Sequence, residues 1–128
     1  LVGAATTSTM TTALVIDNDP AIRQLLTMAL EQGGVRVLTA ASAKAAEKIL
    51  RHQNADVLLV DLHLGGGDSG ATMVDSWSAK GMLRPFLVVT GTPDHPSLKA
   101  MKDFSEFRGV VAKPFQILDL VKQEKSLS

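Results

Sequence analysis

Short apolar runs alternate with longer segments of helical periodicity along this chain of 128 residues. The runs "ALVI" (13–16), "DVLLV" (56–60) and "RPFLVVTG" (84–91) carry few polar positions and predict buried strands. "VRVLTA" (35–40) predicts a more exposed strand, and "GVVAKPF" (109–115) predicts a short fifth strand. The apolar character of the first, third and fourth strands is typical of the centre of a parallel sheet.

The segments between the strands predict helices. From Pro20, apolar residues recur at three- and four-residue spacing as far as Leu30, which is one stripe of an amphipathic helix. Asp19 suits the N-cap of this helix, and Gly33 with Gly34 suits its end. The remaining helices are predicted over 43–52 (capped by Ser42), 71–81, 97–104 and 116–125.

Strand and helix alternate five times, which predicts an α/β fold with a doubly wound, five-stranded parallel sheet. The length suits one domain with a sizeable core, which we assign to residues 13–128. Residues 1–12 are small and polar, and we interpret them as a disordered lead-in or a remnant of cloning. Folds of this kind bind ligands beyond the carboxyl ends of the strands, so the strand ends are the candidate site.

The composition excludes several classes of function. The formal net charge is zero and the pI is about 7.0, unlike the basic footprint of a protein that binds nucleic acid directly. The chain has no cysteine, which excludes disulfides, thiolate metal sites and thiol catalysis. Because no run approaches a membrane-spanning length and the start lacks the features of a secretory signal, we expect a cytoplasmic protein.

Polar residues stand at four predicted strand ends. They are Asp17 with Asn18, Asp61, Thr90 and Lys113. Crowded carboxylates raise one another's pKa unless a cation joins them. Mg²⁺ suits one or two carboxylates with neutral oxygens, water and a phosphate. A hydroxyl and an ammonium group could then hold the remaining phosphoryl oxygens.

Four segments in this order carry a resemblance to a known family. "VIDNDPAIR", "DVLLVDLHL", "LVVTG" and "VVAKPF" resemble the receiver domain of two-component response regulators, from Ala13 to the last helix. No segment is specific alone, but all four at fitting intervals are. The resemblance implies a flavodoxin-like receiver fold with strand order 2-1-3-4-5.

The resemblance also implies roles for individual residues. Asp61 would accept a phosphoryl group, while Thr90 and Lys113 would hold it. Mg²⁺ would be bound by Asn18, Asp61 and the backbone carbonyl of His63, and by Asp17 through a water molecule. The peptide bond before Pro114 would be cis.

The implied partner is a sensor histidine kinase or a histidine phosphotransfer protein. The fourth helix, fifth strand and fifth helix would form a surface for a homodimer or a downstream effector, with no direct contact to nucleic acid or membrane. Such a domain catalyses only its own phosphorylation and slow dephosphorylation, and is otherwise no enzyme.

Four departures from the family pattern shape these expectations. Asn18 stands where the family has a second acid, which predicts weaker Mg²⁺ binding. Gly65 replaces a proline in a glycine-rich loop that we interpret as flexible. Val110 replaces the aromatic residue that reports movement of the switch hydroxyl, so output requires another element. His63 and Thr92 offer no carboxylate or amide to activate water, which predicts slow hydrolysis of the aspartyl phosphate.

Three alternatives stay open on sequence alone. A haloacid-dehalogenase-like phosphatase would use Asp17 as nucleophile and Asp19 as acid/base, although capping is the favoured role of Asp19. This alternative lacks the family's threonine or valine at Ala21, a later strand-end acid and an insertion after the first strand. A pseudo-receiver would bind partners without phosphorylation, as Asn18 and Val110 suggest. Flavin binding lacks the Ser/Thr-rich phosphate loop after the first strand.

Overall fold

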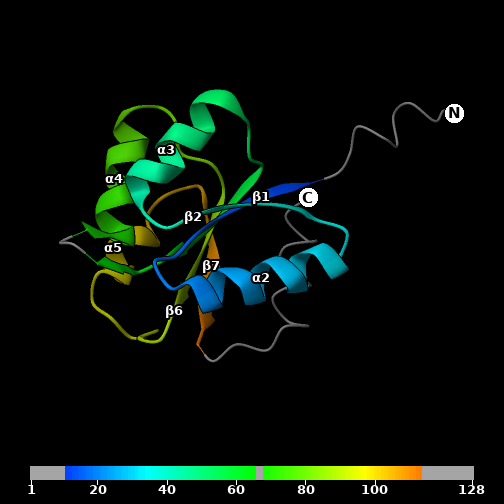
Figure 1. Ribbon diagram of the computed structural model, residues 1–128. Coiled ribbons are helices and arrows are strands. Elements are labelled where there is room, and N and C mark those ends of the chain that lie inside the picture. The colour runs from blue at the N-terminus through cyan, green and yellow to red at the C-terminus, as the bar shows by residue number, and fades with distance from the viewer. Residues whose placement is uncertain (1–10, 66–67, 114–128) are drawn as a thin grey trace, which may run out of the picture.

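The computed structural model describes residues 11–65 and 68–113. Five parallel strands form the main sheet in the order β2-β1-β3-β6-β7, which confirms the predicted doubly wound order 2-1-3-4-5 (Figure 1). Its strands are β1 (Thr12–Ile16), β2 (Arg36–Ala40), β3 (Val57–Asp61), β6 (Phe86–Thr90) and β7 (Phe107–Ala112). The described helices are α2 (Pro20–Gln32), α3 (Ala43–His52), α4 (Gly70–Ala79) and α5 (Leu98–Met101).

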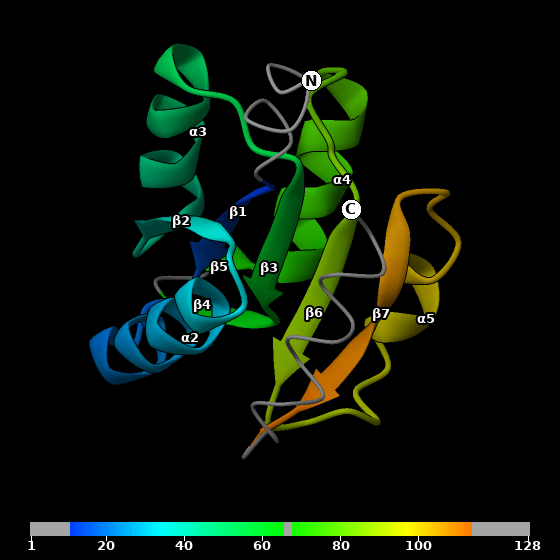
Figure 2. The same cartoon turned by 90° about the vertical axis from the view of Figure 1, so that its right-hand side faces the viewer.

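Helices cover both faces of the sheet (Figures 1 and 2). Because successive strand residues point to opposite faces, Leu14 and Ile16 pack in the core beneath α3, α4 and α5. Ala13 and Val15 pack in the second core, which contains Leu26 of α2. β1, β3 and β6 are buried along their whole length, whereas β2 is partly exposed, as predicted.

The predicted caps of the first two helices are confirmed. The Asp19 carboxylate accepts a hydrogen bond from the Ala21 N–H at 2.9 Å, and the Ser42 hydroxyl accepts one from Ala45 at 3.1 Å. Gly34 adopts a φ of 84°, a left-handed conformation that favours glycine after a helix. The Asp19 cap begins α2 at Pro20, with only three residues between the helix and the end of β1.

Several predicted boundaries are wrong. β1 begins at Thr12, which we had assigned to the lead-in, and β7 begins at Phe107 rather than at residue 109. α5 spans a single turn instead of residues 97–104. Beyond that turn, the Asp103 and Phe104 N–H groups bond to carbonyls three residues earlier, so the chain tightens and leaves the α-helix. The predicted helix 116–125 and Pro114 lie outside the described residues.

The glycine-rich segment after β3 contains a small antiparallel sheet where we predicted a flexible loop. β4 (His63–Gly65) pairs with β5 (Asp68–Ser69). The Gly70 N–H donates to the Leu62 carbonyl at 2.8 Å and closes the segment. This β4–β5 hairpin therefore rises directly from Asp61 and leads into α4.

None of the helices in the described ranges has the length and hydropathy that crossing a bilayer requires.

Candidate functional site

The carboxyl ends of four parallel strands meet at one edge of the sheet. Asp17 directly follows β1, Asp61 and Thr90 are the last residues of β3 and β6, and Lys113 directly follows β7. The register pairs Asp61 with Val89 and Thr90 with Ala112, and the Lys113 N–H donates to the Thr90 carbonyl at 2.8 Å. The fold thus brings together side chains that are up to 96 positions apart in the sequence.

Lys113 joins the two acids. Its Nζ lies 2.9 Å from Asp17 Oδ2 and 3.5 Å from Asp61 Oδ1. The side chains of Asp17 and Asp61 are 2% and 8% exposed, and the Lys113 side chain is 21% exposed. Two buried negative charges therefore share one cation, which leaves the site with a net attraction for a further positive charge.

One backbone group and one side chain from the start of α2 fix Asp17 in place. Its Oδ1 accepts a hydrogen bond from the Asp19 N–H at 2.9 Å, and its carbonyl accepts one from Arg23 Nη1 at 2.8 Å. Both donors belong to the start of α2, so the helix that Asp19 caps also orients Asp17. Both oxygens of the Asp17 carboxylate are consequently engaged, one by Asp19 and the other by Lys113.

Asp61 lies in a different electrostatic environment. Burial raises the pKa of its carboxyl and the neighbouring Asp17 charge raises it further, while Lys113 and a hydrogen bond from the His63 N–H oppose the rise. The His63 N–H donates to Oδ1 at 3.3 Å, the same oxygen that faces Lys113. Within the described part of the chain, Oδ2 has no hydrogen-bond donor and is the free oxygen of the carboxylate.

Asp61→Asn is expected to stabilise the metal-free protein at pH 7. Because the pKa of Asp61 is raised on folding, the folded state favours the protonated acid: stability from this group is complete at low pH and is lost as pH rises through the raised pKa. The neutral amide avoids this loss. We expect the substitution to raise the free energy of unfolding by about 1 kcal/mol, and Tm by about 4 °C, at pH 7.

Thermal unfolding between pH 4 and 8 measures this effect, and the gain should shrink as pH falls, because protonation then removes the charge of Asp61 in the parent as well. Asp75→Asn on the exposed face of α4 is the matched control and should change Tm little at any pH. A variant that is less stable than the parent at pH 7 would contradict the assignment.

Asn18 is exposed, directly follows Asp17, and its amide lies close to Gly65 of the β4–β5 hairpin. Its Nδ2 would lie 3.1 Å from a Cβ added at Gly65, a residue with φ of +78°. Any side chain at position 65 would therefore be strained and would crowd the Asn18 amide. The glycine that replaces the family's proline leaves room for this amide at the rim of the site.

The donor set fits Mg²⁺. In the residues described, no group of three histidine, cysteine or acidic side chains is placed to hold a metal ion. Asp17 and Asp61 supply two carboxylates, and Asn18 and the His63 carbonyl would add neutral oxygens. Mg²⁺ is bound in this way, by few carboxylates and several waters, whereas structural zinc requires a closed set of nitrogen or sulfur ligands.

Thr90 is fully buried at the edge of the site. Its Oγ1 accepts a hydrogen bond from the Thr92 N–H at 3.0 Å and lies 3.1 Å from Thr92 Oγ1. These contacts turn the hydroxyl towards the loop after β6, so its predicted contact with a phosphoryl group stays a prediction.

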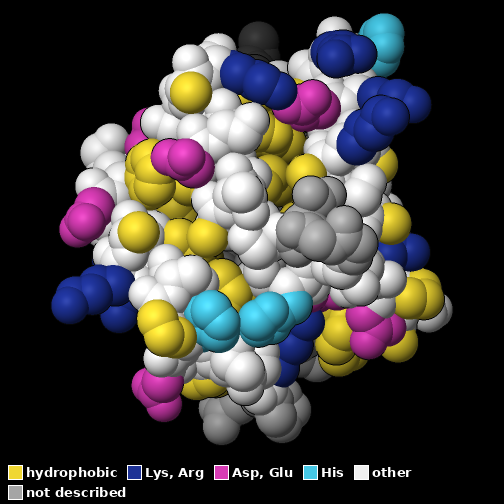
Figure 3. Space-filling model, turned by 90° about the vertical axis from the view of Figure 1, so that its left-hand side faces the viewer, with side chains coloured by type: hydrophobic (Ala, Val, Ile, Leu, Met, Phe, Trp, Pro, Cys, Tyr) yellow, Lys and Arg dark blue, Asp and Glu magenta, His cyan; other side chains and the backbone are white. Residues whose placement is uncertain are grey.

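Sequence reasoning treated His63 and Thr92 as separate positions, but the fold joins them. His63 Nε2 lies 2.9 Å from Thr92 Oγ1. The His63 ring also packs edge-to-face on His95, with centroids 5.3 Å apart. Figure 3 shows two histidine side chains next to each other on this face. His63 and Thr92 are 29 positions apart in the sequence, so no local pattern reveals the contact.

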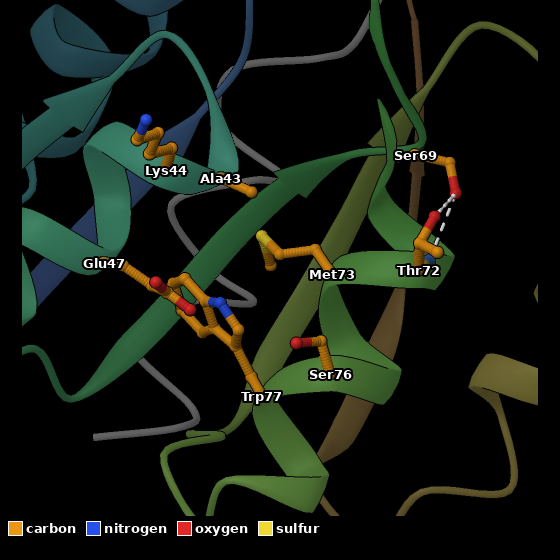
Figure 4. Close-up of a pocket in the computed structure, with 8 residues that line it drawn as sticks. All are labelled: Ala43, Lys44, Glu47, Ser69, Thr72, Met73, Ser76 and Trp77. Carbon is orange, nitrogen blue, oxygen red and sulfur yellow. Dashed lines mark hydrogen bonds between the residues drawn. The ribbon is translucent and has the colours of Figure 1, made fainter. Parts of the chain in front are cut away.

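A groove lies away from these residues, between α3 and α4 (Figure 4). Met73 and Trp77 form its buried floor. Polar side chains of Lys44, Glu47 and Thr72 surround it, and Glu47 pairs with Lys80 on α4's C-terminal side. None of the predicted site residues lines it.

Comparison with known proteins agrees with the geometry. The sequence model of the family described as "Response regulator receiver domain" matches residues 13–124. The regulatory protein VirG of Agrobacterium fabrum is 31% identical over 102 residues, covering 80% of this chain and 40% of VirG. The swarming motility regulation protein RssB of Serratia marcescens is 29% identical over 115 residues, covering 90% of this chain and 52% of RssB.

Solved structures share the fold. The Vibrio cholerae chemotaxis protein CheY4 has a TM-score of 0.80 at 25% identity, over 93% of this chain and 99% of that chain. A Francisella response regulator receiver domain has a TM-score of 0.78 at 22% identity, over 91% and 95% of the two chains. This chain spans about a quarter to a half of the length of the curated relatives. The matched range and the strand-end residues show that the chain belongs to the response regulator receiver domain family of two-component systems.

Proposed function

We propose that this receiver domain accepts a phosphoryl group on Asp61 in a Mg²⁺-dependent reaction. The donor is the phosphohistidine of a sensor histidine kinase or a histidine phosphotransfer protein. The observation that carries the proposal is a buried Asp61 whose Oδ1 faces Lys113 and whose Oδ2 has no hydrogen-bond donor among residues 11–65 and 68–113. A carboxylate held in this way can attack while its charge remains balanced.

The transfer follows from these positions. Asp61 Oδ2 attacks the phosphorus, a P–O bond forms, and the P–N bond to the donor breaks with its electron pair left on the imidazole nitrogen. Lys113 offsets charge on the transferring oxygens, and Asp17 holds Lys113 in place. When bound by Asp17, Asn18, Asp61 and the His63 carbonyl, Mg²⁺ supplies further positive charge to those oxygens.

The same contacts disfavour the phosphatase alternative. Both oxygens of Asp17 are engaged, by the Asp19 N–H and by Lys113. The Asp19 carboxylate caps α2 through the Ala21 N–H. A nucleophile needs a free oxygen and an acid/base needs access to the leaving group, and Asp61 meets the first requirement better than Asp17 does.

Incubation with acetyl phosphate, with and without Mg²⁺, tests the proposal through the intact mass of the protein. We expect a gain of one phosphoryl group that requires Mg²⁺ and disappears in Asp61→Asn. The matched control Asp75→Asn, an exposed acid on α4, should be phosphorylated like the parent. Label on Asp17 or turnover without Asp61 would establish the phosphatase alternative, and the absence of any label would establish a pseudo-receiver.

Asn18→Asp is expected to tighten Mg²⁺ binding about 5- to 10-fold at low ionic strength. A third carboxylate near the metal adds Coulomb attraction of about 1 kcal/mol through solvent. Isothermal titration calorimetry with MgCl₂ measures the change. Asn54→Asp, in the exposed turn before β3, adds the same charge away from the site and should leave the affinity unchanged. Equal affinities of Asn18→Asp and the parent would exclude Asn18 as a ligand position.

A further inference from the structure

We propose that Thr92 couples the Thr90 hydroxyl to the imidazole of His63, so that phosphorylation of Asp61 releases the β4–β5 hairpin from the loop after β6. The trigger rests on the proposed function, whereas the coupling itself exists in the unphosphorylated protein. Thr92 acts in this scheme as a positioning residue, because it reaches the site only through Thr90 and His63.

Three contacts form a continuous chain. The Thr92 N–H donates to Thr90 Oγ1 at 3.0 Å, the two hydroxyl oxygens lie 3.1 Å apart, and Thr92 Oγ1 lies 2.9 Å from His63 Nε2. Thr90 is fully buried, whereas Thr92 and His63 are exposed. The chain thus leads from the buried end of β6 to the surface of the hairpin.

The hydroxyl of Thr90 cannot serve two orientations at once. Both contacts of the Thr90 side chain in the structure go to Thr92, and both are made by Oγ1, which χ1 rotation carries to a single place at a time. Turning this hydroxyl towards a phosphoryl group on Asp61 breaks those contacts. Thr92 then loses the partner that holds its own hydroxyl within hydrogen-bond distance of His63 Nε2.

His63 is placed to transmit the change in two directions. Its backbone N–H donates to Asp61 Oδ1, so the hairpin is already attached to the phosphorylation site. Its ring packs on His95, whose Nδ1 accepts a hydrogen bond from the Ser97 N–H at 3.1 Å, directly before α5. Movement at Thr90 therefore reaches both the hairpin and the start of α5.

This path needs no aromatic residue on β7. Val110 stands at the position from which a ring would follow the switch hydroxyl, and it packs partly buried against the core. A β-branched aliphatic side chain has no polar atom with which to report a hydroxyl's position. The polar chain through Thr92 supplies a route for the signal that Val110 cannot.

The imidazole ¹⁵N and ¹³C resonances of His63 test the coupling in the unphosphorylated protein at one fixed pH. Thr90→Val and Thr92→Val should each shift them, and the double variant should match Thr92→Val alone, since the two residues act in one chain. Thr92→Ser keeps the hydroxyl and should retain the parental resonances. Thr39→Val, on exposed β2, is the matched control, and His52 on α3 is the internal reference.

The same resonances are then recorded after phosphorylation, with the mass gain measured on the same sample. We expect the His63 resonances to shift in the parent and to stay in place in Thr92→Val, although that variant still gains the phosphoryl group. Unchanged His63 resonances in unphosphorylated Thr90→Val, or equal shifts in parent and Thr92→Val on phosphorylation, would overturn the coupling. A missing mass gain would instead overturn the proposed function, and the unphosphorylated variants would still decide the coupling.

Discussion

Lys113→Met is expected to lower the free energy of unfolding by about 2–3 kcal/mol at pH 8 without Mg²⁺, and to slow phosphorylation of Asp61 by about 100-fold or more. Lys113 is the cation that both buried carboxylates contact, at 2.9 Å and 3.5 Å. Removing it leaves Asp17 and Asp61 with neighbouring charges of the same sign. We place the cost below that of a fully buried pair because the Lys113 side chain is 21% exposed.

The pH dependence of this loss identifies its cause. Asp61 already has a raised pKa, and the loss of Lys113 removes an interaction that opposes the rise. Protonation of Asp61 relieves the repulsion, so the loss of stability should shrink as pH falls from 8 to 5. Mg²⁺ replaces the missing positive charge, and saturating Mg²⁺ should recover part of the stability.

Urea unfolding of the parent and the variant measures the loss, and mass spectrometry after acetyl phosphate measures the rate. Lys80→Met is the matched control, because Lys80 pairs with Glu47 at 2.6 Å but is 53% exposed. Exposed pairs contribute less than about 1 kcal/mol. If Lys113→Met lowers the free energy of unfolding no more than Lys80→Met does at pH 8, Lys113 does not offset the charges of Asp17 and Asp61 as described.

Gly70→Ala is expected to destabilise the protein by about 2–3 kcal/mol, which corresponds to roughly 8–12 °C in Tm. Alanine is the better helix former by about 1 kcal/mol, so propensity alone predicts the opposite sign. Packing against β3 reverses the sign of the expected change in stability. A Cβ at position 70 would lie 2.6 Å from the Asp61 carbonyl oxygen and 3.0 Å from Val60 Cγ1, and the backbone atom cannot turn aside.

The same substitution should reduce the rate of the proposed phosphorylation of Asp61, because the added methyl group would press on the Asp61 backbone. Thermal unfolding and the mass assay measure the two effects. Gly91→Ala is the matched control for stability, since a Cβ there would meet open space, and its Tm should change by no more than a few degrees. A Gly70→Ala variant as stable as Gly91→Ala would show that the close approach does not constrain α4.

Local pattern was sufficient for most of the fold. Apolar runs identified β1, β3 and β6 because these strands are buried on both faces and need no polar side. Asp19 and Ser42 marked two helix starts because an N-cap is a contact between near neighbours in sequence. The strand order came from the family resemblance, and the observed sheet has it.

Local pattern failed where longer-range contacts decided the outcome. The glycines after Asp61 indicated flexibility, yet that segment contains the β4–β5 hairpin, which the contact of Gly70 with Leu62 closes. The periodicity of 97–104 predicted a longer helix than α5, whose later residues tighten into three-residue turns before β7. Pairing along the chain and across the sheet competes with helical propensity, and propensity is the weaker of the two.

The sequence by itself determined which chemical groups stand at the strand ends, namely Asp17, Asp61, Thr90 and Lys113. Each residue is read directly from the sequence, and each strand end is recognised from the few residues around it. Only the tertiary structure decided how they are used. In the fold, the two oxygens of Asp17 contact the Asp19 N–H and Lys113, and Asp61 Oδ1 accepts from the His63 N–H. Among the described residues, Asp61 Oδ2 has no hydrogen-bond donor. The Thr90 hydroxyl contacts Thr92, which in turn contacts His63. Such choices depend on distances between residues far apart in the chain, which are fixed only when the strands come together in the sheet.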